Sequence, residues 1–328
     1  HNATVNTLRM WNAEVNRDFS DYGLLTQEEI QQRNDYRSFV ESITRYLYPD
    51  DSTFEGRRMR LIQEYFFVSA GVQSIVRHYK KTGMSIYDFG KKIGIHINDT
   101  HPALCVAELM RVLVDEEELT WEDAWAITRD TIAYTNHTIM PEALETWSID
   151  MFQPLLPRIY MIIDEINRRH LEEVRRRYPN NEDKVRALSI IQDGVIHMAR
   201  LSIVGGHSVN GVAKIHTGIL KSTTLKDFYD YTPRKFNNKT NGITHRRWLM
   251  GANPELAALI DNILNSREWH RHPEKMDGLH DHVDDKNFLE QLMKIKYLRR
   301  EGLAHYIEQH NGVKLNPDSM FDIQVKRI

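Results

Sequence analysis

Residues 134–145 read YTNHTIMPEALE, and this stretch says most about how the chain folds and what it does. It combines an amide, an imidazole, a hydroxyl and two carboxylates, carried by Asn136, His137, Thr138, Glu142 and Glu145. Pro141 predicts the start of a helix, because proline is tolerated at the first helical position and carboxylates suit the positive end of the helix dipole. A loop fixed in this way can offer several hydrogen-bond partners to a ligand that carries many hydroxyl groups.

The composition is that of an ordinary globular protein with room for about two domains. The chain has 328 residues, of which 41% are hydrophobic and 27% charged, and 43 basic against 46 acidic side chains give a formal net charge of −3. This balance gives no reason to expect nucleic acid or an anionic membrane as a partner. The sequence shows no apolar stretch of membrane-spanning length and no secretion leader, so we expect a cytoplasmic protein.

Apolar spacing and helix caps predict a chain in which helices far outnumber strands. Helices are expected at 26–48, 56–81, 101–113, 121–133, 141–147, 154–178, 182–188, 195–204, 211–220, from 254 onward and at 285–310. Strands are expected at 5–11, 91–98 and 321–328, and residues 228–236 are expected to be irregular. Cys105 lies in an apolar run and is the single cysteine of the chain, so we expect a buried, inert thiol.

Residues 134–145 also resemble the active-site loop of the α-glucan phosphorylases, the family of glycogen, starch and maltodextrin phosphorylases. Eight further stretches resemble family motifs in the family's order: 47–50, 54–56, 63–66, 98–102, 108–113, 207–212, 238–244 and 325–328. The resemblance implies the GT-B fold, in which two Rossmann-like α/β domains face each other across a cleft. This chain would be a helix-rich part of it, with residues 1–240 the later part of the N-terminal domain and 241–328 the start of the C-terminal domain.

The resemblance also implies a role for each candidate residue. His137 would contact the reacting sugar, through its side chain at the 6-hydroxyl and through its backbone carbonyl near the ring, and Asn241 would share that hydroxyl. The other residues expected to bind substrate or shape its cleft are Asp99, His101, Asn136, Thr138, Glu142 and Glu145. Asp51 and Ser52 match a loop that gates the cleft, although the best-known animal enzymes carry asparagine at the position of Ser52.

The residues by themselves leave simpler roles open. Asn241 precedes a glycine, which is a common turn pair, and Asp99 is able to cap the helix that follows it. Glu142 and Glu145 lie three apart on the predicted helix, so a solvated helix face explains them as well as a positioning role.

Metal binding is a further alternative for the histidines. His96, Asp99 and His101 lie close together in the sequence, but their spacing matches no standard zinc signature. A second group of histidines, at 270, 272, 280 and 282, lies among aspartates in a polar, turn-like region. We expect a surface loop there and assign no metal ligand in the chain.

For the whole enzyme, the resemblance implies a glycosyltransferase that passes the terminal α-1,4-glucosyl unit of a glucan to inorganic phosphate. Pyridoxal phosphate is the cofactor of that family, and a homodimer is its usual assembly. The cofactor lysine is expected outside this chain, so the chain is expected to be a central part of a longer enzyme and inactive alone. The alternatives are a non-catalytic glucan-binding fragment and a metal-dependent hydrolase that uses the histidine clusters.

Overall fold

The computed structural model describes residues 5, 7–15 and 25–323. The chain divides into two compact units, residues 1–241 and residues 242–328. The assignment of residues 1–240 and 241–328 to the two domains of the phosphorylase family stays a prediction.

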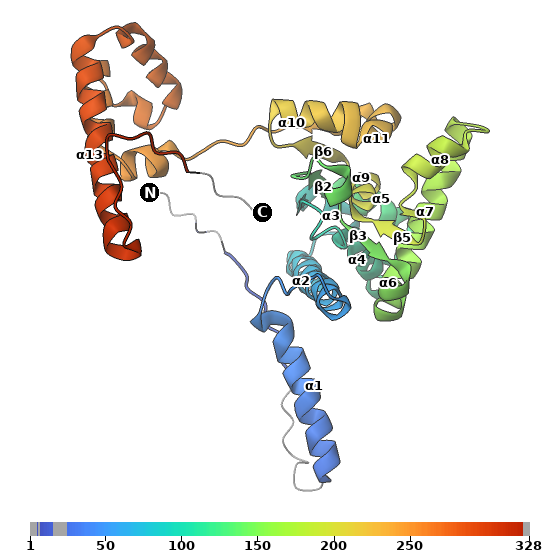
Figure 1. The fold of residues 1–328 in the computed structure, drawn as a ribbon. Helices are drawn as coiled ribbons and strands as arrows, with labels where there is room; N and C mark the ends of the chain where they lie inside the picture. Colours follow the sequence, from blue (N-terminus) through green and yellow to red (C-terminus); the bar gives the residue numbers. More distant parts are fainter. Residues whose placement is uncertain (1–4, 6, 16–24, 324–328) are drawn as a thin grey trace. The chain divides into compact units, whose positions relative to one another are not determined.

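A parallel sheet of four strands forms the centre of the first unit (Figure 1). In spatial order its strands are β1 (Ile95–Asn98), β2 (Ile132–Thr135), β6 (Ser208–Gly211) and β7 (Phe236–Asn238). Ile97, Ile132, Tyr134 and Val209 are fully buried in it. Because all four strands run in the same direction, their carboxyl ends meet at one edge of the sheet.

Helix α4 (Cys105–Arg111) lies in the middle of the helical layer beside this sheet. It packs against α2 (Phe54–Lys80), α5 (Trp121–Thr131), α7 (Pro157–Arg177) and α9 (Met198–Gly205). A Cβ at Gly205 would lie 2.4 Å from the side chain of Val106, so the close approach of α9 to α4 requires glycine. Burial raises the pKa of the Cys105 thiol to about 12, which fits the buried, inert cysteine predicted from the sequence.

The first unit also contains a second sheet and several further helices and turns. A small antiparallel sheet has the order β3 (Thr146–Ser148), β5 (Val195–His197) and β4 (Ile191–Gln192). The remaining α-helices are α1 (Gln27–Arg45), α3 (Phe89–Lys92), α6 (Ile149–Leu155), α8 (Glu182–Leu188), α10 (Lys214–Ile219) and α11 (Lys226–Tyr231). Short 3-10 or π turns lie at Ile86–Asp88, Val112–Glu116, Pro141–Ala143, Leu220–Thr224 and Pro233–Lys235.

Several segments predicted to be helical contain strands instead. The helix predicted at 121–133 ends at Thr131, and the chain continues as β2. The predicted helices at 195–204 and 211–220 start in β5 and β6, and residues 141–147 form a 3-10 turn followed by the start of β3. The segment 228–236, expected to be irregular, holds most of α11 and the first residue of β7. Short strands buried on both faces lack the apolar–polar alternation that marks a half-exposed strand, so they read as helix.

Other boundaries also differ from the prediction. The predicted strand at 5–11 is not formed by the described residues of that stretch, where Val5, Leu8 and Met10 are exposed. Residues 321–323 carry no strand either, and 324–328 lie outside the described residues. The strand expected from residue 91 begins at Ile95, the helix expected from 101 begins at Cys105, and Leu156 separates α6 from α7 within 154–178.

The second unit is helical and has its own small core. Its main helices are α12 (Pro254–Leu264) and α13 (Lys286–Asn311), and short turns lie at Arg246–Gly251, Glu268–His270 and Pro273–His282. Ala257, Ile260 and Trp269 form the core. Asn253 and Asp285 accept hydrogen bonds from the first turns of α12 and α13, which confirms both predicted helix starts.

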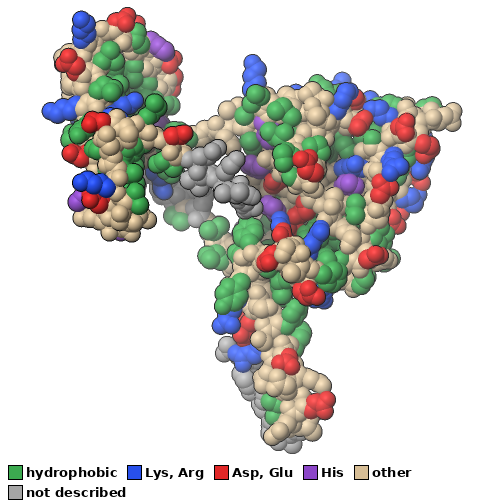
Figure 2. Space-filling model, viewed as in Figure 1, with side chains coloured by type: hydrophobic (Ala, Val, Ile, Leu, Met, Phe, Trp, Pro, Cys, Tyr) green, Lys and Arg blue, Asp and Glu red, His purple; other side chains and the backbone are tan. Residues whose placement is uncertain are grey.

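Figure 2 shows acidic and basic side chains interspersed over the visible surface rather than gathered into a field of one sign. This distribution fits the nearly balanced charge of the sequence. Among the described helices, none combines the length and the apolar character that crossing a membrane requires.

Candidate functional site

The candidate site lies at the edge of the parallel sheet where the strands end. The register places Asn98 of β1 beside Thr135 of β2, Thr135 beside Asn210 of β6, and Gly211 beside Asn238 of β7. The polar residues that follow these strands therefore gather at one edge, which is where open parallel sheets bind ligands. His137 and Asn241 both belong to this group.

His137 and Asp99 connect the ends of β1 and β2. The Nε2 atom of His137 lies 2.6 Å from Oδ1 of Asn98, and the His137 side chain is exposed. The carboxylate of Asp99 accepts the Thr138 hydroxyl at 3.0 Å and the Thr100 N–H at 2.9 Å. Asp99 has φ of 58°, a conformation that aspartate tolerates better than most residues. The capping role that the sequence left open for Asp99 is wrong, because the following helix begins only at Cys105 and no side chain caps it. Asp99 instead links the end of β1 to the loop of His137.

Asn136 lies behind this loop rather than on its exposed face. It is fully buried; its Oδ1 accepts the Thr138 N–H at 2.9 Å, and its Nδ2 donates to the Tyr134 hydroxyl at 3.0 Å. The amide is therefore engaged on both sides. In this structure Asn136 holds the loop that presents His137 and does not itself face solvent.

Asn241 follows β7 and is fixed through its backbone. Its N–H donates to the Val212 carbonyl at 2.8 Å, and its side chain is exposed. The strands β2 and β7 are separated only by β6, so the backbones after them are about 10 Å apart at this edge. At this backbone separation, one side chain from each segment can contact the same small polar ligand between them.

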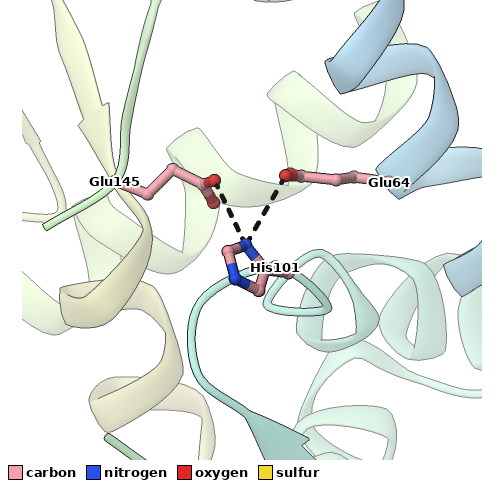
Figure 3. A group of neighbouring side chains, drawn as sticks. All are labelled: Glu64, His101 and Glu145. Carbon is pink, nitrogen blue, oxygen red and sulfur yellow. Dashed lines mark ion pairs between the residues drawn. The ribbon is translucent and has the colours of Figure 1, made fainter. Parts of the chain in front are cut away.

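A second group of polar residues centres on Arg60, which lies on α2. Its guanidinium is 2.7 Å from the Asp51 carboxylate, and 3.3 Å from each of Glu64, Glu145 and Nδ1 of His101. Figure 3 shows the carboxyl groups of Glu64 and Glu145 directed toward each other and toward the imidazole of His101. These contacts bring the candidate residues His101, Glu145 and Asp51 together around one cation.

The Glu64 carboxyl of this cluster does not ionise easily. Burial raises the pKa of Glu64 well above its usual range, and the neighbouring Glu145 carboxyl raises it further, against the opposing effect of Arg60. Oε2 of Glu64 and Oε1 of Glu145 are buried and have no hydrogen-bond partner among the described residues. A proton on Glu64 would relieve both oxygens. The Glu145 carboxylate also raises the pKa of His101, against burial and the positive charge of Arg60.

The Glu64→Gln variant is expected to flatten the pH dependence of stability. The Glu64 carboxyl of the unfolded chain loses its proton near its ordinary pKa of 4.5, whereas the folded protein raises this pKa to about 10 and keeps the proton to higher pH. Unfolding between these values releases a proton, so the free energy of unfolding falls as pH rises, by at most about 1.4 kcal/mol per pH unit. Glutamine keeps the shape and removes the titration. Urea unfolding of the intact protein at about pH 5 to 8 measures this slope.

Glu172→Gln is the control for this measurement, because the Glu172 side chain on α7 is 55% exposed. We expect the pH slope of the control to match that of the native protein. An unchanged slope in Glu64→Gln would show that Glu64 ionises normally in the folded state.

The predicted gating residues lie in a turn next to this cluster. Asp51 is held by Arg60, and the Ser52 N–H donates to the Asp50 carboxylate at 3.0 Å. A Cβ at Gly56 would lie 1.7 Å from the Asp50 carbonyl oxygen, so this glycine allows the turn to pack on the start of α2. The turn is thereby anchored at both ends, and its gating role stays a prediction.

The prediction that Glu142 and Glu145 share one helix is wrong. Pro141 opens only a 3-10 turn that ends at Ala143, and Glu145 lies in the extended segment before β3. Glu142 is exposed, whereas the Glu145 side chain is 12% exposed and directed at Arg60. Tertiary contacts with α2 therefore separate two carboxylates that the sequence pattern had placed together.

The histidine groups weighed as metal sites do not gather in the described part of the chain. The His96 ring contacts the Thr135 hydroxyl, 2.5 Å away, and His270 pairs with Asp261, His272 with Glu274 and His282 with Asp285. Among the described residues, ligand atoms of Glu64, His101 and Glu145 do lie within 4.8 Å of one another. The guanidinium of Arg60 already supplies a positive charge to all three, so we assign no metal to them.

Sequence reasoning did not identify Arg60, Glu64 or His216 as parts of this site. Arg60 and Glu64 are four residues apart on α2, a spacing that is typical of an exposed helix ion pair. His216 follows a glycine-rich stretch and carries no pattern of its own. Their importance depends on distant partners, since Glu145 lies 85 residues from Arg60 and Asn136 lies 80 residues from His216.

Comparison with known proteins places the whole chain in one family. The carbohydrate phosphorylase family matches residues 1–328. The glycogen phosphorylase of Bacillus subtilis (strain 168) is 49% identical over 325 residues, which cover 99% of this chain and 40% of that protein. The muscle form from Bos taurus and the liver form from Homo sapiens are each 45% identical over 338 aligned residues, covering 100% of this chain and 40% of those proteins. The chain thus spans about 40% of the length of these relatives, and it belongs to the carbohydrate phosphorylase family.

Proposed function

We propose that this chain forms the glucosyl-binding part of an α-glucan phosphorylase. Such an enzyme transfers the terminal α-1,4-linked glucosyl unit of glycogen, starch or maltodextrin to inorganic phosphate, and gives glucose 1-phosphate with retention of configuration. The observation that carries the proposal is that His137 and Asn241 follow strands ending at one edge of the parallel sheet, in a chain of this family.

His137 and Asn241 are the residues proposed to hold the sugar. An amide offers both a donor and an acceptor, and an imidazole offers one or the other at each nitrogen, so the pair can satisfy a hydroxyl in both of its roles. Both side chains are exposed at the sheet edge. The backbone carbonyl of His137 would face the sugar ring, where a fixed dipole stabilises the positive charge of an oxocarbenium-like transition state.

The remaining candidates shape and hold the cleft. Asp99 and Thr138 bind each other and fix the loop of His137 from one side, and Asn136 fixes it from behind. The cluster of Arg60, His101 and Glu145 would form a polar wall, and Asp51 joins the gating turn to that wall. Glu142 and Ser52 are exposed and would lie at the rim.

We assign no residue of this chain to pyridoxal phosphate. Lys235 has the chemistry of an imine-forming lysine, since burial lowers its pKa to about 7. However, Lys235 precedes β7, at the opposite end of the strand from Asn241, and its Nζ donates to the carbonyls of Ile203 and Val204 at 2.8 and 3.4 Å. It therefore closes the end of α9 and does not fit the role of the cofactor lysine.

The intact protein is expected to release glucose 1-phosphate from maltoheptaose in the presence of inorganic phosphate. The 328-residue chain alone is expected to show no turnover, because the resemblance places the cofactor lysine elsewhere. A coupled assay of glucose 1-phosphate on both preparations, with phosphate omitted as the control, makes the measurement. The proposal fails if the intact protein gives no glucose 1-phosphate.

The alternative is a glucan-binding protein without catalysis. Calorimetric titration of the intact protein with maltoheptaose, and with an unrelated sugar as control, separates the two. Binding of maltoheptaose without any phosphorolysis would favour the alternative. The homodimer of the family stays a prediction for this protein.

A further inference from the structure

We propose that His216 is a positioning residue that holds the two sugar-binding loops, those of His137 and Asn241, in one arrangement. The inference rests on the proposed function for its catalytic consequences. His216 lies on α10, which packs against β6 and β7, and the side chain is buried on the inner side of the candidate site.

The hydrogen bonds of His216 define which nitrogen carries its proton. Its Nδ1 accepts the backbone N–H of Val212 at 3.2 Å, so Nδ1 has no proton. Its Nε2 lies 3.1 Å from Oδ1 of Asn136, which can only accept, so Nε2 carries the proton and donates. The imidazole is therefore neutral and is held in one tautomer by two partners. Asn136 follows the end of β2, and Val212 follows the end of β6.

Each partner of His216 leads directly to one of the proposed sugar-binding residues. The Oδ1 atom of Asn136 accepts hydrogen bonds both from His216 and from the N–H of Thr138. Asn136 and Thr138 flank His137, so this one oxygen fixes the backbone on both sides of His137. On the other side, the Val212 carbonyl accepts the N–H of Asn241 at 2.8 Å. One buried ring thus spans β2 and β6 and fixes the backbone on both sides of the site.

A protonated His216 could not keep this arrangement, because a hydrogen on Nδ1 would point at the hydrogen of the Val212 amide. The surroundings favour the neutral ring: burial lowers the pKa of His216, the nearby His137 lowers it further, and only Asp99 opposes them. The geometry and the surroundings therefore both favour a neutral His216 ring, which offers one donor and one acceptor to the two loops.

Two substitutions separate the two bonds. His216→Asn places an oxygen near the position of Nδ1 and keeps an acceptor for Val212, but it loses the donor to Asn136. His216→Gln places an N–H near the position of Nε2 and keeps the donor, but it loses the acceptor for Val212. Because small displacements at a reacting centre are costly, we expect each variant of the intact protein to lose about 10- to 100-fold in kcat/KM for phosphorolysis of maltoheptaose.

A combined substitution distinguishes positioning from a purely structural role. If His216 acts through the loop of His137, His216→Asn should cost little further in kcat/KM once His137→Ala is present. The control is His170→Gln, since His170 is as deeply buried but its Nε2 contacts the Leu188 carbonyl, outside the candidate site. We expect the control to lower the unfolding midpoint without changing kcat or KM of the folded protein.

The outcomes are separable from those that test the proposed function. Losses that add fully in the double variant, or folded His216 variants with native kcat and KM, overturn the role of His216.

If the native intact protein shows no phosphorolysis, the proposed function fails instead. Nitrogen NMR of the labelled histidines then tests the role of His216 without any assay of activity. A neutral Nε2–H ring at His216, together with a His137 signal that moves in His216→Asn, supports positioning; an unmoved His137 signal overturns it.

Discussion

Replacement of Arg111 by alanine is expected to lower the free energy of unfolding by about 3 to 5 kcal/mol, the usual consequence of breaking a buried ion pair by removing one partner. The partner is Glu108 of α4, which is fully buried. Arg111 binds it with two hydrogen bonds of 2.8 Å, one to each carboxylate oxygen. Without the guanidinium, the carboxylate would remain in the middle of the helical layer with only neutral donors.

Those neutral donors are the hydroxyls of Tyr65 and Ser69, at 3.0 and 2.8 Å from the carboxylate. Burial raises the pKa of Tyr65 to about 12, and the negative charge of Glu108 adds to the effect, so Tyr65 stays a donor at any working pH. Two neutral hydrogen bonds cannot replace a bidentate charge-assisted pair, which is roughly twice as strong per bond. The missing guanidinium is therefore expected to dominate the loss.

Urea unfolding of the intact protein measures the effect, and Arg158→Ala is the matched control. Arg158 also binds a carboxylate, Asp115, but the two side chains are 45% and 31% exposed. An exposed pair of this kind contributes about 0 to 1 kcal/mol. Equal losses in the two variants would show that the burial of Glu108 does not decide the outcome. Adding Glu108→Gln to Arg111→Ala should recover part of the loss, because it removes the unpaired charge.

The sequence predicts the elements of this chain whose signals are local. The starts of α5 and α12 follow from local signals, because Thr120 and Asn253 cap the helices directly after them. The helices predicted from residues 26 and 285 begin one residue later, at Gln27 and Lys286, where Thr26 and Asp285 act as caps. Long helices such as α2 were found from apolar spacing, although α2 begins two residues earlier than predicted, at Phe54. These signals come from residues within one helical turn of one another, so they can be recognised without knowledge of the fold.

The parallel sheet was mostly missed, because its strands depend on pairing between distant segments. Ile132–Thr135 is four residues long and buried, and it follows α5 without a break, so no local signal separates it from the helix. Its strand character comes from pairing with β1 and β6. The site residues at the ends of these strands were identified from the family resemblance and not from a predicted sheet. Arg60 and Glu64 were missed for the same reason, since only the fold brings Glu145 to them.

Replacement of His137 by alanine is expected to reduce kcat/KM for phosphorolysis by about 100- to 1000-fold in the intact protein, the range found when one preorganised hydrogen-bonding group is removed from a site. The backbone carbonyl of residue 137 remains, so catalysis should fall without vanishing. His137 contacts Asn98 and is exposed, so its loss should leave the fold intact. Rates with maltoheptaose and phosphate, with the unfolding midpoint measured in parallel, test both expectations.

The 6-hydroxyl of the glucosyl unit is the group that this prediction depends on, and it can be removed from the substrate as well. In the direction of glucan synthesis, the native protein should prefer glucose 1-phosphate strongly over its 6-deoxy analogue, because a site built to bind a hydroxyl rejects a ligand without it. His137→Ala should lose most of that preference, whereas His305→Ala, on an exposed histidine of α13, should keep it. If His137→Ala discriminates between glucose 1-phosphate and the 6-deoxy analogue as well as the native protein does, the imidazole does not bind this hydroxyl. The positions of His137 and Asn241 at one sheet edge would then serve a different role.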